Sequence, residues 1–97
     1  MLDLEKVREI AKDVASEIIG SETVEDVRSE SIVDSLGADA LRVLIVLREN
    51  WVDRLSGDAA LDTLVRLHRR LTEQGEERFP IINYATLAEL EGGNSSP

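Results

Sequence analysis

Apolar residues recur at steps of three and four along the N-terminal part of the chain. Because an α-helix turns once in about 3.6 residues, this spacing places them on one side of a helix. Asp3 is suited to cap the free backbone amides at the start, and Gly20 can adopt the left-handed conformation just past the end. The pattern predicts a helix over residues 3–19, with apolar positions Leu4, Val7, Ile10, Ala11, Val14 and Ile18.

A second amphipathic pattern follows, and it ends near residue 74 because Gly75 can close the helix. Either Ser56 or Asp58 can cap its start. Before this helix, the helical spacing of Trp51, Val52 and Leu55 predicts one short helical turn. The apolar face of the second helix consists of Ala60, Leu61, Leu64, Leu67 and Leu71, and the largely opposite charged face of Arg66, Arg69, Arg70 and Glu73.

Two strands are predicted between the helices. From Leu41 the chain continues into an aliphatic, largely β-branched run, Val43 to Leu47, which is bracketed by Arg42 and Arg48 and has no polar gap, so we expect the central strand here, covered on both faces. Residues 22–34 are polar with scattered apolar positions, which is typical of a weak, twisted edge strand. Residues 34–39 carry Asp, Ser and Gly and predict a loop between these two strands.

A third strand is predicted over residues 79–84, where Pro80 has no N–H and belongs near the start or at an edge. Thr86 and Glu89 have the spacing of a capping box, which predicts a last helical turn through Glu91. The order is helix, strand, strand, helix, strand. Each apolar helix face must be buried against another layer, so we predict an α+β fold: a two-layer sandwich of a three-stranded sheet with two long helices on one face (α-β-β-α-β).

One α+β domain is expected over residues 1–91, followed by a flexible C-terminal tail over residues 92–97. The order of elements resembles that of a type II KH domain, which binds nucleic acid through a GxxG loop between adjacent helices. The corresponding loop here is Ser56-Gly57-Asp58-Ala59, which lacks the glycine pair and carries an acid. The resemblance therefore implies no nucleic-acid binding.

Charge and composition narrow the classes of function. The 97 residues include 20 acidic and 11 basic side chains, a formal net charge of -9. This surplus repels phosphate backbones and anionic headgroups, so neither nucleic acid nor a membrane is an expected partner. The absence of cysteine excludes disulfides and thiol chemistry. No signal peptide or bilayer-spanning run is visible, so the expected location is cytoplasmic.

Residues 31–41 resemble the attachment segment of an acyl carrier protein. That family has a Leu-Gly-x-Asp-Ser-Leu run ahead of its second helix, and the serine hydroxyl carries the phosphopantetheine arm. When residues 36–39 are matched to Leu-Gly-x-Asp, the attachment position is Ala40, which has no hydroxyl; when residues 34–36 are matched to Asp-Ser-Leu, it is Ser35. The resemblance implies a carrier-like protein, degenerate at Ala40 or modified on Ser35, with a helix where the strand at Leu41 is otherwise predicted.

Other candidate chemistry has two interpretations each. His68 is the only imidazole, but no nucleophile motif accompanies it, so a boundary position on the second helix is favoured over proton transfer. Arg66, Arg69 and Arg70, with Arg78 beyond the helix, either receive a carboxylate or phosphate, or neutralise the acids of the first helix. Trp51 with Val52 either anchors an interface or caps the core.

The lack of a convergent catalytic set favours a non-enzymatic protein-interaction module without cofactor or metal. We expect it to bind a protein with a basic surface, or a second copy of itself, through the exposed side of the sheet or an unpaired strand edge. The interaction candidates are Trp51, Val52, Arg66, Arg69 and Arg70. The carrier-like alternative depends on Ser35 and on a helix after Ala40.

Overall fold

The computed structural model describes residues 1–92. The elements in chain order are α1 (Leu4–Ile18), β1 (Val24–Val33), β2 (Asp39–Leu47), the 3-10 turn η1 (Glu49–Asp53), α2 (Gly57–Glu73), β3 (Phe79–Thr86) and α3 (Leu87–Gly92). Every predicted helix and strand is present, with ends displaced by a few residues. A flexible tail is expected from residue 92, but Gly92 is still the last residue of α3. Residues 93–97 lie outside the part of the chain that the structure describes.

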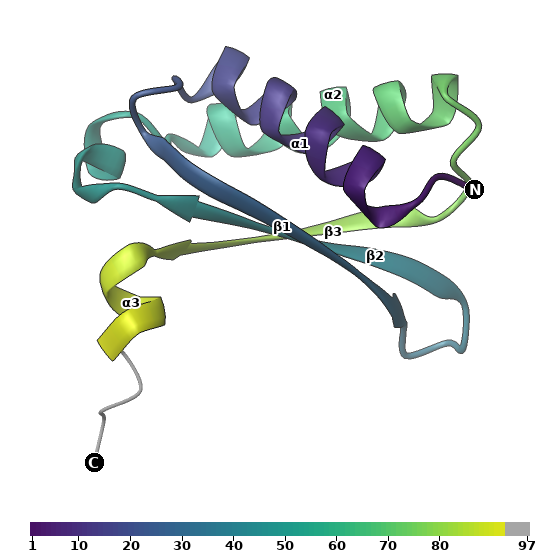
Figure 1. Ribbon diagram of the computed structural model, residues 1–97. Coiled ribbons are helices and arrows are strands. Elements are labelled where there is room, and N and C mark those ends of the chain that lie inside the picture. Colours follow the sequence, from purple (N-terminus) through teal and green to yellow (C-terminus); the bar gives the residue numbers. More distant parts are fainter. Residues whose placement is uncertain (93–97) are drawn as a thin grey trace.

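The three strands form one mixed sheet in the order β1-β2-β3. β2 pairs with β1 in antiparallel and with β3 in parallel orientation. Two parallel neighbours need a crossover connection, and α2 supplies it. Figure 1 shows α1 and α2 together on one face of the sheet, which gives two layers. The predicted α+β fold, with its central strand and two long helices, is confirmed.

Alternate residues of β2 face the two long helices and form the centre of an aliphatic core. Leu41, Val43, Ile45 and Leu47 are buried there with residues of α1 and α2. On the opposite face Arg42 is exposed and Leu44 is only half-buried. The expectation that both faces of this strand are covered is therefore wrong for the middle of the outer face, although Ala40 and Val46 near its two ends are buried. An aliphatic residue can occupy a half-exposed sheet position, so the run lacks polar gaps without being covered on both sides.

Local capping explains where the helices begin. The Asp3 carboxylate accepts a hydrogen bond from the Lys6 amide at 2.8 Å, as predicted for α1. Ser56, not Asp58, caps α2, because its hydroxyl accepts from the Ala59 amide at 3.0 Å. The Thr86 and Glu89 capping box is also present: the Thr86 amide donates to Glu89 Oε1 at 2.8 Å, and the Glu89 amide donates to the Thr86 hydroxyl at 3.1 Å.

A buried ion pair between α2 and β3 holds the N-terminal residues in place. Glu76 Oε2 accepts hydrogen bonds from the Arg78 amide at 2.8 Å and from Arg78 Nε at 2.9 Å. Glu76 Oε1 accepts from the Leu2 amide at 2.8 Å, and Arg78 Nη2 donates to the Leu2 carbonyl at 2.8 Å. Glu76 is 3% exposed, and the hydrogen bonds from Arg78 lower its pKa to about 2. Arg78 is thus buried and separate from the surface arginines of α2, with which it was expected to form one positive patch.

Candidate functional site

The surface arginines of α2 are largely occupied by one acid of α1. Arg70 Nη2 lies 3.0 and 3.1 Å from the two carboxylate oxygens of Glu17. Arg66 Nη1 lies 3.7 Å from the same carboxylate. Arg69 takes part in no ion pair among the described residues. The structure favours the interpretation in which these arginines neutralise the first helix, and it does not assemble them into an anion site.

His68 lies exposed on α2 beside the start of β3. Its ring meets the ring of Phe79 edge to face, with centroids 4.8 Å apart and planes at 66°. Its imidazole makes no hydrogen bond to the described residues, among which there is also no group of three His, Cys, Asp or Glu side chains suited to a metal ion. The structure therefore places His68 in an aromatic contact at the boundary of the helix.

The segment that resembles a carrier attachment site is a β-hairpin. Ser35 is exposed in the turn, where the Asp34 carboxylate accepts from two amides of the same turn at 2.9 Å each. Ala40 is buried in β2. Residues 39–47 are a strand where the resemblance implied a helix. The expectation of a helix after Ala40 is wrong, and the carrier-like alternative loses the element on which it depended.

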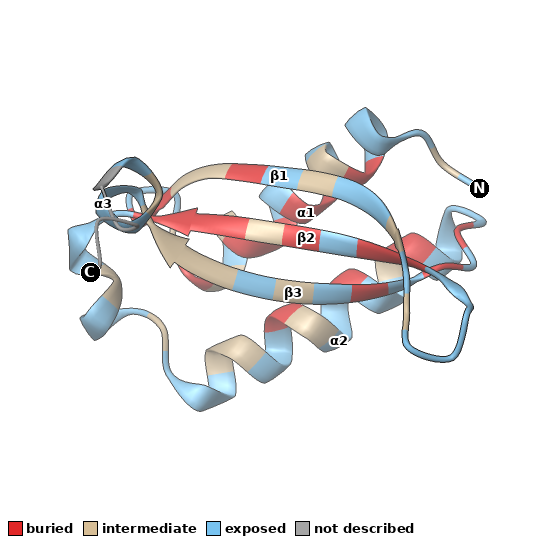
Figure 2. Cartoon of the chain, turned by 90° about the horizontal axis from the view of Figure 1, so that it is seen from below, coloured by how far each residue is buried: buried red, intermediate tan, exposed pale blue. Residues whose placement is uncertain are grey.

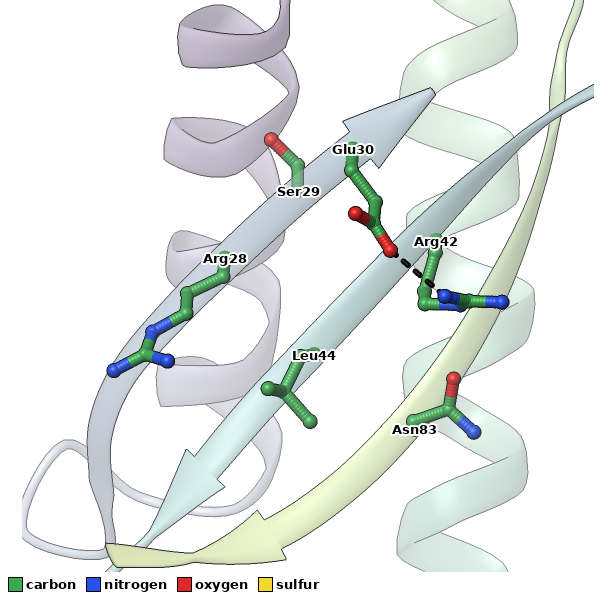
Figure 3. Close-up of a pocket in the computed structure, with 6 residues that line it drawn as sticks. All are labelled: Arg28, Ser29, Glu30, Arg42, Leu44 and Asn83. Carbon is green, nitrogen blue, oxygen red and sulfur yellow. Dashed lines mark hydrogen bonds and ion pairs between the residues drawn. The ribbon is translucent and has the colours of Figure 1, made fainter. Parts of the chain in front are cut away.

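The face of the sheet turned away from α1 and α2 carries a shallow depression of about 530 Å³. Its charges are compensated locally. Figure 3 shows Glu30 paired with Arg42 beside Leu44 and Asn83, while Arg28 is directed away from them. The Arg42 to Glu30 distance is 2.8 Å, and Arg28 has its own acidic neighbour at 3.7 Å. This mixture of polar and apolar side chains is typical of the solvated face of a sheet.

The two edges of the sheet differ in how they are protected. β1 contains a bulge near Asp26 and four charged residues, which are means by which natural sheets block pairing with another chain. β3 forms the other edge and has no charged residue from Phe79 to Thr86. Phe79 is 49% exposed, and Ile81 is also exposed. Pro80 removes one N–H near the start of β3, but β3 has no strand partner on its outer side among the described residues, so its edge is left open beyond Pro80.

An apolar groove follows this open edge. α2 lies beside β3, and in Figure 2 it extends beyond β3 on the side away from β2. Between them is a cavity of about 430 Å³, which we call the α2–β3 groove. Leu61 at its rim is 59% exposed. Grouped exposed apolar side chains mark interaction surfaces. The groove is lined by Ala60, Leu61, Leu64, Phe79, Pro80, Ile81, Ile82 and Tyr84.

A second, smaller cavity of about 230 Å³ lies at the end of the sheet next to η1 and α3. Trp51 forms part of its wall and is half-buried against the core, whereas Val52 is exposed. Trp51 thus both caps the core and lines a cavity. We call this cavity the Trp51 pocket; it is lined by Leu47, Trp51, Leu55, Tyr84, Ala85, Thr86 and Glu89.

Tyr84 belongs to the walls of both cavities, so the groove and the Trp51 pocket are neighbours. The Tyr84 hydroxyl is buried near the Thr63 side chain, but it makes no hydrogen bond of normal length and angle to the described residues. Burial raises the pKa of this phenol more than the neighbouring Thr63 side chain lowers it. At neutral pH the side chain is an uncharged partition between the apolar α2–β3 groove and the Trp51 pocket, whose walls are partly polar.

Trp51 is a candidate that the sequence predicts, whereas the sequence does not predict the groove. Its residues come from two segments that only the crossover connection brings together, and Leu61 and Leu64 were assigned to the face of α2 that packs on the core. One signal was available in the sequence. The strand over residues 79–86 has no charge, although the chain is rich in charged residues elsewhere.

Comparison with known proteins adds no relative: no family profile, no curated sequence and no solved structure matches the chain. None of the helices over residues 1–92 combines the length and the apolar character needed to cross a bilayer.

Proposed function

We propose that this chain is a non-enzymatic protein-interaction module that binds an extended segment of another protein in the α2–β3 groove. The segment pairs with β3 as an added strand. The observation that carries the proposal is the open, uncharged edge of β3 beside an apolar groove. In this mode of recognition the main-chain hydrogen bonds supply affinity, and the pockets for alternate side chains supply specificity.

The position of α2 favours a single strand over a second copy of the chain. α2 extends past the edge of β3, so it already occupies the helix layer above any strand added there (Figure 2). A second copy that paired through its own β3 would bring its own α2 into the same layer. A lone extended segment has no helix layer, and it can place its apolar side chains against Leu61 and Leu64.

Electrostatics favour a segment from a basic protein. The net charge of -9 is carried by other elements, and the strand that would pair contributes none of it. The surplus attracts a basic partner over a Debye length of about 8 Å at physiological salt and accelerates its encounter. The apolar groove then holds the part of the segment that has no charge.

Nuclear magnetic resonance titration of the labelled protein tests this proposal. The probe is an acetylated and amidated peptide, Gly-Ser-Thr-Val-Thr-Val-Thr-Val-Ser-Gly, in which apolar side chains alternate along a strand. We expect amide shifts confined to residues 60–64 and 79–86. Leu61→Asp should weaken binding by at least about tenfold. Leu36→Asp, the same change at an exposed position of the hairpin turn, should leave the affinity unchanged.

Two results would contradict the proposal. One is the absence of shifts along β3 at peptide concentrations of about 2 mM, where even a millimolar complex is populated. The other is a concentration-dependent dimer in sedimentation that Leu61→Asp dissociates and the peptide cannot displace. That second result would make another copy of the chain the occupant of the groove.

A further inference from the structure

We propose that the Trp51 pocket receives a lysine or arginine side chain of the segment bound in the α2–β3 groove. The inference depends on the proposed function, because it concerns a residue that flanks the part of the segment paired with β3. It names the chemistry of that residue and the acid that recognises it.

The walls of the pocket suit a long side chain with a charged end. Trp51 and Tyr84 supply aromatic surface, and Leu47 and Leu55 supply aliphatic surface. Lysine and arginine lay their methylene stems on such surfaces while the charged group stays near water. A tryptophan ring also attracts a cation electrostatically. An acidic side chain would find no positive group among the residues that line the pocket.

Glu89 places a carboxylate at this pocket in a defined orientation. Its Oε1 atom accepts hydrogen bonds from the Thr86 amide at 2.8 Å and from the Thr86 hydroxyl at 3.1 Å. Its Oε2 atom makes no hydrogen bond, and Glu89 takes part in no ion pair, within residues 1–92. Glu30, by contrast, is paired with Arg42 at 2.8 Å. Glu89 is therefore a positioned acid with one oxygen free to receive a cation.

The place of the pocket follows from the direction of β3. The groove runs along β3 from Phe79 to Tyr84, and the Trp51 pocket begins on the other side of Tyr84. A segment paired along β3 would therefore bring one of its flanking residues to the pocket. The volume of about 230 Å³ holds one side chain and leaves no room for a further strand.

The test compares two peptides with the core used above. One has lysine at both ends of the Thr-Val-Thr-Val-Thr-Val core, and the other has norleucine, which keeps the apolar stem and lacks the charge. Placing the residue at both ends makes the result independent of strand direction. We expect the lysine peptide to bind about fivefold more tightly, the size of an ion pair at a partly exposed site.

Glu89→Gln should remove most of this preference for lysine. The glutamine oxygen can still accept from Thr86, so the cap of α3 is kept. Glu91→Gln is the matched control: it removes the same charge from the same helix, and Glu91 does not line the pocket. Because both variants reduce the net charge equally, general attraction of the peptide changes equally in both. Trp51→Leu should also reduce the preference for lysine.

Equal affinity for the lysine and norleucine peptides would overturn the inference, and so would equal losses in Glu89→Gln and Glu91→Gln. In either case the norleucine peptide still reports on the groove, so the proposed function would stand. Failure of both peptides to shift the amides of β3 would instead remove the proposed function, and the inference with it.

Discussion

Acidification should remove a defined part of the folding stability through Glu76. Its pKa falls from 4.5 to about 2 in the folded chain, mainly because Arg78 donates hydrogen bonds to the carboxylate. At about 1.4 kcal/mol per pKa unit, the ionised side chain contributes about 3 kcal/mol to the free energy of unfolding at neutral pH. Because the pKa is lowered on folding, this contribution is complete above pH 4.5 and is lost as the pH falls toward 2. About 2 kcal/mol of this contribution to the free energy of unfolding should be lost between pH 7 and pH 3.

Urea unfolding followed by the fluorescence of Trp51, the only tryptophan, measures this loss. Glu76→Gln should be destabilised by about 3 kcal/mol at pH 7, because Arg78 is left buried without its charged partner. The variant should lose about 2 kcal/mol less than the wild type between pH 7 and pH 3. Asp26 also has a lowered pKa: burial is the largest single influence and raises it, but the hydrogen bonds from Arg8 and the Val27 amide, together with the charges of Arg8 and Arg28, outweigh burial. Its acid sensitivity is common to both proteins and cancels in the comparison.

Glu30→Gln is the matched control, because it makes the same chemical change in an ion pair of similar length. Glu30 and Arg42 are 2.8 Å apart but about half exposed, so this variant should lose less than about 1 kcal/mol at pH 7. If Glu76→Gln lost as much stability as the wild type between pH 7 and pH 3, the assignment of this acid sensitivity to Glu76 would be refuted.

The remaining predictions concern packing, capping and the partition between the cavities, each measured by urea unfolding. Leu67→Ala should lose about 2–5 kcal/mol, because Leu67 is fully buried on α2 and its removal leaves a cavity; a loss below about 1 kcal/mol would contradict the placement of the core. Ser56→Ala should lose about 1 kcal/mol and Asp58→Ala clearly less, since only Ser56 caps the helix. Tyr84→Phe should be neutral or stabilising within about 1 kcal/mol, because the buried hydroxyl it removes makes no hydrogen bond of normal geometry; a larger loss would mean that the hydroxyl is bonded to Thr63.

The sequence predicted the elements well because each was specified locally. The caps at Asp3 and Thr86, the glycines after the helices and the spacing of apolar residues all act within a few positions. The strand after Ala40 could be distinguished from the carrier helix by its run of β-branched residues alone. The same run explains the wrong prediction that both faces of this strand are covered, because an aliphatic run does not show whether one or two layers pack against it.

The candidate site was harder to predict because it is made by contacts between distant segments. Leu61 has the spacing of a core residue, yet α2 extends past the edge of β3 and leaves this side chain exposed at the groove. Arg78 is charged and follows a surface helix, yet Glu76 and the backbone of Leu2 satisfy its donors in a buried position. A pattern within a few residues of sequence does not predict where one helix or strand lies relative to another.

The bond between Leu2 and Glu76 also bears on the order in which the molecule assembles during translation. The two residues are separated by 74 positions, whereas the β1–β2 hairpin closes over a short turn. The hairpin can form while the ribosome is still adding α2, but Leu2 lacks the partners of its backbone hydrogen bonds until Glu76 and Arg78 have left the exit tunnel. Stalling synthesis before that point should leave a nascent chain in which the backbone around Leu2 stays accessible to proteases.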